Sequence, residues 1–136
     1  MYNKTRNPFE EGNKMNKDNV LNNYLEIVPE VQERFKKQCK KSLIDDTDGA
    51  HVIWSLGLVP CVIELIKDNK KNESVLQRTF TFFEEMASSD EEVRELLLYS
   101  VLEKLGDDKE TLNISMTLMG ENTLKLSQQV ENFLGR

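Results

Sequence analysis

Apolar residues recur at helical spacing along most of the chain, and this periodicity limits the fold more than any other feature. In the clearest segment, Leu76, Phe80, Phe83 and Ala87 are spaced at i, i+4, i+7 and i+11. Residues with this spacing share one side of an α-helix, whereas a strand with one buried face alternates with a period of two. The pattern therefore predicts a helix in this segment and an all-α fold for the chain.

The same periodicity, combined with helix-capping residues, predicts six to seven helices. Asp18, Asp48, Ser89 and Asp107 are predicted N-caps, and Gly106 is predicted as the C′ glycine after a helix over 90–105. Apolar stripes predict which residues are buried in the first two helices and in the last: Val20, Leu21, Tyr24, Leu25 and Val28; Val31, Phe35, Cys39 and Leu43; Leu126, Val130, Phe133 and Leu134.

Two segments lack a simple amphipathic stripe. Residues 48–68 are apolar on almost every side, so they are expected to form the central helix, kinked or split at Gly57 and Pro60. The uncharged run 51–63 within it is shorter than the roughly 20 residues that span a bilayer, so no membrane span is predicted. Residues 112–118 alternate apolar and polar side chains, which is also a strand pattern, but the capping signal before them favours a helix.

Short polar connections between these helices favour antiparallel pairs of neighbours. We expect one helical domain over residues 18–136, preceded by a disordered lead over 1–17. The layout of residues 72–106 is similar to one unit of a HEAT or armadillo stack, although no internal repeat is visible. An irregular bundle and a short stack of this kind both remain open.

Few residues in the chain suggest chemistry. His51 is the single histidine, and the two cysteines, Cys39 and Cys61, have no spacing typical of a disulfide framework or a zinc site. Lysines beside Cys39 suggest a lowered thiol pKa, whereas its place on an apolar stripe favours the core. We predict no catalytic residue, no metal site and no cofactor, with an enzyme that uses Cys39 or His51 as a third-ranked hypothesis.

The net charge of −6 argues against nucleic acid and anionic membranes as partners, because both attract positive charge. Residues 1–72 carry a charge of +1 and residues 73–136 a charge of −7. Carboxylates that complement helix dipoles explain part of this excess. The remainder predicts an acidic surface that steers a basic protein, formed by Glu84, Glu85, Asp90, Glu91, Glu92, Glu95, Asp107 and Asp108.

Residues 82–93 (FFEEMASSDEEV) and 100–105 (SVLEKL), together with 50–54 (AHVIW), resemble a family of small, all-helical, largely uncharacterised bacterial proteins. The resemblance covers roughly residues 18–106. Members of this kind look like immunity proteins of polymorphic toxin systems, which implies a protein that neutralises a toxin by binding it. The resemblance does not identify the toxin.

These observations lead to one functional expectation with one alternative. We expect a non-enzymatic, cytoplasmic inhibitor whose acidic surface binds a basic toxin domain. The alternative is a helical-repeat-like scaffold for protein interactions with no toxin partner. The sequence leaves the oligomeric state open.

Overall fold

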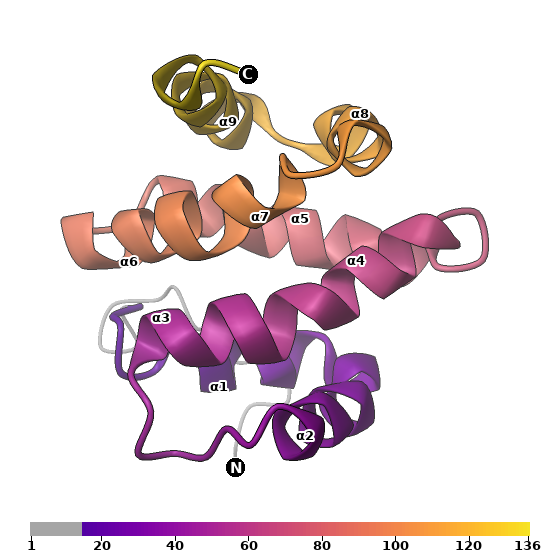
Figure 1. Cartoon of the computed structure of the whole chain (residues 1–136), viewed down its shortest axis with the longest axis vertical. Helices are drawn as coiled ribbons and strands as arrows, with labels where there is room; N and C mark the ends of the chain where they lie inside the picture. Colours follow the sequence, from indigo (N-terminus) through magenta and orange to yellow (C-terminus); the bar gives the residue numbers. More distant parts are fainter. Residues whose placement is uncertain (1–14) are drawn as a thin grey trace, which may run out of the picture.

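The computed structural model describes residues 15–136 and confirms the all-α prediction, with seven continuous helices and no strand in that range (Figure 1). The predicted lead lies outside the described residues, except for residues 15–17. Of these, Met15 is buried in the core. The elements are, in order, α1 (Val20–Ile27), η1 (Pro29–Val31), α2 (Gln32–Lys41), α3 (Ala50–Val52), η2 (Ile53–Leu58), α4 (Val59–Lys67), α5 (Glu73–Ala87), α6 (Glu91–Leu96), η3 (Leu97–Leu102), α7 (Glu103–Leu105), α8 (Lys109–Leu118) and α9 (Glu121–Leu134).

The helices are stacked around α5. In Figure 1, α8 and α9 lie on one side of α5 and of the helix formed by α6, η3 and α7, while α1 and α2 lie on the other side. The core contains Tyr24 of α1, Trp54 of η2 and Phe82 of α5. The ring centroid of Tyr24 lies 5.4 Å from that of Phe82 and 6.1 Å from that of Trp54. The Tyr24 hydroxyl is hydrogen-bonded to Thr79 Oγ1 at 2.8 Å, so this buried polar pair is satisfied.

Two helices contain a π-helical turn: η2 joins α3 to α4, and η3 joins α6 to α7. The central helix is therefore continuous from Ala50 to Lys67. The predicted alternative of a split at Gly57 and Pro60 is wrong. Gly57 has a different role, because a Cβ there would lie 3.1 Å from both Cys39 Sγ and Phe35 Cε1. The missing side chain lets α2 pack closely on η2.

Four predicted N-caps are wrong by one position: the observed N-caps are Asn19, Gly49, Asp90 and Asp108. Asp90 accepts a hydrogen bond from the Val93 amide at 3.0 Å, and Asp108 accepts one from the Thr111 amide at 2.9 Å. Gly106 does not adopt the left-handed conformation of a C′ glycine, since its φ is −83°. A Cβ at Gly106 would lie 2.5 Å from Arg136 Nη2 and even closer to the Glu131 carboxylate, so these two side-chain ends would have to shift to admit it.

The alternating residues 112–118 form part of α8, as predicted. Three residues assigned to buried stripes lie on the surface instead: Leu43 is 90% exposed, Phe133 86% and Leu134 40%. Leu43 lies beyond the last residue of α2, and the other two lie in the last turn of α9. Helical spacing cannot identify such residues, because no neighbouring helix covers these positions.

The central helix, residues 50–67, has a mean hydropathy of 1.5 and is long and apolar enough to cross a membrane by length and composition alone. The uncharged run 51–63 is shorter than this helix, because the helix continues through Glu64 to Lys67. In the structure, Trp54, Leu58 and Val62 of this helix are buried in the core, as expected for a central helix in a folded domain.

Candidate functional site

The predicted acidic residues fall into two groups at opposite ends of one helix. Glu84, Glu85, Asp90, Glu91, Glu92 and Glu95 surround the turn between α5 and α6, whereas Asp107 and Asp108 follow α7. The helix from Glu91 to Leu105 is about 20 Å long at 1.5 Å per residue. The structure therefore brings the first six together and places Asp107 and Asp108 apart from them.

Glu84 is half-buried and binds the start of α9. One carboxylate oxygen accepts hydrogen bonds from the Thr123 amide and hydroxyl at 2.9 and 2.8 Å, and the other accepts one from the Asn122 amide at 3.0 Å. Burial raises the pKa of Glu84, but these hydrogen bonds together outweigh burial and hold the pKa below its usual range. Glu84 therefore acts as the N-terminal cap of α9, contributed by another helix.

Asp107 and Asp108 also make contacts within the fold. Asp107 pairs with Arg136 at 2.9 Å, and Arg136 also binds the carboxylate of Glu131 at 2.8 Å. Asp108 caps α8, and hydrogen bonds from the backbone and side chain of Thr111 lower its pKa. These contacts account for both carboxylates without an external partner.

Four carboxylates remain exposed around the α5–α6 turn, and we name this set the acidic face: Glu85, Glu91, Glu92 and Glu95. Glu85 lines a hollow that also involves Ile27 of α1, and the other three belong to α6. Glu91 and Glu95 are four residues apart on α6, so they share one side of that helix. Glu92 makes an ion pair with Lys17 at 3.5 Å, and within residues 15–136 the other three have no ion pair. Asp90 is exposed beside them, but its carboxylate caps α6.

An exposed aromatic pair continues this helix face. Tyr99 is 52% exposed and lies four residues beyond Glu95, which places the two side chains on the same side of the helix. Tyr99 and Phe133 line a groove of about 180 Å³ between η3 and α9, together with Leu98, Glu103, Gln129 and Val130. We name Tyr99 and Phe133 the aromatic pair. Helical spacing placed Phe133 on a predicted buried stripe, and no pattern in the sequence singled out Tyr99.

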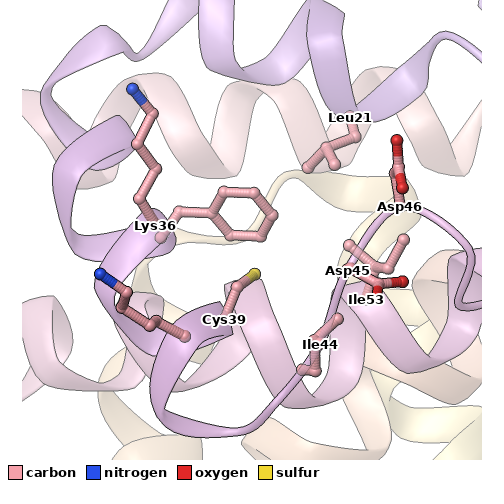
Figure 2. A pocket seen from close by; sticks show the side chains of 9 residues that line it. Leu21, Lys36, Cys39, Ile44, Asp45, Asp46 and Ile53 are labelled. Atoms are coloured by element: carbon pink, nitrogen blue, oxygen red, sulfur yellow. The ribbon is translucent and has the colours of Figure 1, made fainter.

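A second hollow lies between α2 and the loop 42–49 (Figure 2). It has a volume of about 440 Å³, and we name it the α2 cavity. Its apolar wall consists of Leu21, Phe35, Cys39, Ile44 and Ile53, and its charged rim of Lys36, Lys40, Asp45 and Asp46. Figure 2 shows Cys39 Sγ pointing into the hollow, with Lys36 on one side and Asp45 and Asp46 on the opposite side. The sequence did not indicate this cavity.

His51 forms a hydrogen bond with a side chain of the helix formed by α6, η3 and α7. Its Nδ1 lies 2.6 Å from Oγ of Ser100, which is only 2% exposed. This hydrogen bond connects α3 to η3, and it satisfies the buried hydroxyl. The arrangement joins a histidine to a serine, but the burial of Ser100 leaves its hydroxyl without access for a substrate, so the pair is best explained as a structural link.

Neither cysteine has the surroundings of a reactive thiol. Burial raises the pKa of Cys39, so the neighbouring lysines do not activate it. Burial also raises the pKa of Cys61 to about 11, and its thiol donates a hydrogen bond to the Gly57 carbonyl at 3.5 Å. Both thiols are free. Among residues 15–136, no three His, Cys, Asp or Glu side chains are arranged to hold a metal ion.

Comparison with known proteins gives a family but no function. No curated protein matches the chain. No solved structure matches it either, so the HEAT or armadillo analogy gains no support from structural relatives. The family described as a domain of unknown function (DUF7674) matches residues 21–135, which extends beyond the residues that carry the resemblance noted in the sequence. The match covers most of the folded domain, and the chain therefore belongs to the DUF7674 family.

Proposed function

We propose that this protein is a non-enzymatic cytoplasmic inhibitor that binds and neutralises a cognate bacterial toxin, and that the acidic face contacts a basic surface of the toxin. The observation that carries the proposal is the concentration of exposed carboxylates at one turn. Glu85, Glu91 and Glu95 are exposed and make no ion pair within residues 15–136, whereas Glu84, Asp107 and Asp108 are used by the fold. Their charge is therefore available to a partner.

Charge alone accelerates association more than it adds affinity, so a stable inhibitor also needs apolar contacts. The aromatic pair supports this part of the proposal. Tyr99 lies on the same helix side as Glu91 and Glu95, and Tyr and other large aromatic residues are enriched among the residues that dominate binding energy. The toxin surface would combine basic residues, which meet the acidic face, with an apolar group that enters the groove between Tyr99 and Phe133.

The proposal is tested with the toxin-like product of an adjacent gene. Co-expression of this chain is expected to restore growth of cells that produce that protein, and the two are expected to copurify. The variant Glu91→Lys/Glu95→Lys should lose most of this protection, because it reverses two of the four carboxylates of the acidic face. Protection that is absent for the unaltered chain, or unchanged in the variant, would contradict the proposal.

A matched control separates the position of the charges from their number. Asp68→Lys/Glu110→Lys makes the same change in net charge with two exposed acids. Asp68 is the C-cap residue of α4 and precedes the start of α5, and Glu110 lies in the first turn of α8. The lengths of α5 and of the α6–α7 helix place each of them about 20 Å from the α5–α6 turn. The control should protect cells as the unaltered chain does. Equal losses in both variants would show that net charge acts without a localised surface.

The alternative of a scaffold with no toxin partner makes a different prediction. A scaffold would bind a non-toxic protein, and its expression would not change the survival of cells that contain the adjacent gene product. The growth experiment therefore distinguishes the two functions.

A further inference from the structure

Leu43 is an exposed leucine in a strained conformation. Its φ is 58°, the left-handed region that favours glycine, and it is the one non-glycine residue with positive φ among residues 15–136. It occupies the C′ position of a Schellman-type ending of α2, in which the Ile44 amide donates to the Cys39 carbonyl at 2.8 Å. Glycine is usual at this position. The leucine side chain is 90% exposed and gains no burial that would offset its strain.

The apolar hollow beside Leu43 has a suitable size and chemistry for a side chain of this kind. Ile44, the next residue, lines the α2 cavity together with Phe35 and Cys39. The cavity volume of about 440 Å³ exceeds the space that one leucine side chain occupies. An exposed apolar side chain therefore precedes, by one position in the chain, a residue that lines an apolar hollow.

The charges around the α2 cavity are divided between its two sides. Lys36 lies on one side, and Asp45 and Asp46 lie on the other (Figure 2). Lys40 follows Lys36 by four residues on α2, so it extends the basic side. A two-fold axis through this surface would place the basic side of one copy against the acidic side of the other. Such self-complementarity is the requirement of a symmetric dimer interface.

We propose that the α2 cavity and Leu43 form a homodimer interface, in which Leu43 of each chain enters the α2 cavity of the other. Lys40 of each chain faces Asp46 of its partner. This inference does not depend on the proposed function, because the acidic face and the aromatic pair lie on other elements, α5, α6, η3 and α9.

The full chain is expected to show a concentration-dependent mass in sedimentation velocity, rising from one chain to two. Leu43→Gly should weaken dimerisation at least about 100-fold, because two buried leucine side chains are lost per dimer. The same variant should unfold at a higher temperature when monomeric, because glycine relieves the strain at this φ. A rise in stability would show that lost dimerisation does not result from misfolding. Phe133→Ser removes another exposed apolar side chain and should leave dimerisation unchanged.

Charge reversals test the two-fold arrangement itself. Lys40→Glu places two acids opposite each other, and Asp46→Lys places two bases opposite each other, so each variant alone should dimerise at least about tenfold more weakly. An equimolar mixture of the two variants should form a heterodimer, because every facing pair is then opposite in charge. Lys40 and Asp46 have no ion pair within residues 15–136, so neither reversal removes one from that part of the fold. A wild-type chain that stays monomeric at all accessible concentrations, or a mixture that does not associate, would overturn the inference.

Discussion

The carboxylate of Glu84 lies directly over Gly120, the residue that precedes α9. A Cβ at Gly120 would lie 2.5 Å from Oε1 of Glu84 and 2.6 Å from its Cδ. Gly120 is the N-cap of α9 and has no side chain to cap it, so Glu84 from α5 supplies the acceptor. The glycine and the glutamate therefore act as one unit that holds α9 against α5.

A double-mutant cycle should measure the coupling energy between Glu84 and Gly120. Glu84→Ala is expected to lower the free energy of unfolding by about 1–2 kcal/mol, because amides at the start of α9 lose their acceptor. Gly120→Ala should cost about the same, because the new methyl group displaces the carboxylate. The double variant should lose less than the sum of the two, since each single change already breaks the same contact. Urea denaturation measures all three, and simple additivity would contradict the assignment.

The lowered pKa of Glu84 predicts how its contribution depends on pH. The folded state favours the ionised carboxylate, so the stabilisation is present above the unfolded pKa of about 4.3 and is lost as pH falls through the folded pKa. Glu84→Gln should therefore destabilise the protein at pH 7 and have a much smaller effect at pH 2. Chemical denaturation at both pH values measures the difference. A cost that is independent of pH would show that the charge of Glu84 is unimportant.

The buried pair of Tyr24 and Thr79 gives a second cycle. Tyr24→Phe should cost about 1–2 kcal/mol, because the Thr79 hydroxyl, which is fully buried, loses its partner. Tyr24→Phe combined with Thr79→Val replaces both polar groups by apolar ones and should recover part of this loss. Thermal unfolding compares the variants. A double variant less stable than the sum of the single losses would contradict this account of the core.

Thiol reactivity tests the structural role of the cysteines. A pKa of about 11 for Cys61 leaves only about one thiolate in a thousand at pH 8. In the native protein at that pH, a thiol-reactive dye should label Cys61 only after unfolding, while Cys39 should react more slowly than an exposed cysteine in a peptide. Cys39→Ser leaves Cys61 as the remaining thiol, and Cys61→Ser leaves Cys39. Faster reaction of Cys39 than of the peptide would revive the hypothesis of a catalytic thiol.

Most of the fold follows from local patterns in the sequence, and the remaining features depend on contacts between distant residues. Helical spacing predicted the core position of Phe83, because a stripe needs only its own helix. The same spacing failed at Phe133, because burial also requires a neighbour that covers the last turn of α9. Gly57 suggested a kink or a split; the helix is not split there, and the missing side chain at Gly57 allows the close approach of α2. No local pattern contains that information.

The acidic surface stays a prediction, and the structure separates its residues by their contacts. Glu91 and Glu95 are exposed. The predicted surface also included Glu84 and Asp108, whose carboxylates cap helices. A carboxylate that binds a partner and one that caps a helix look alike in sequence, because both occur near helix ends. The structure distinguishes them by their hydrogen bonds.

The most direct test of the acidic face is the association rate with the purified toxin-like product of the adjacent gene, measured by stopped-flow at low and at high salt. The unaltered chain and Asp68→Lys/Glu110→Lys should associate quickly at low salt and slow down strongly as salt is added, because screening weakens steering. Glu91→Lys/Glu95→Lys should associate at least about tenfold more slowly at low salt and depend little on salt. Equal rates for all three proteins would contradict the proposal that this surface recognises a basic partner.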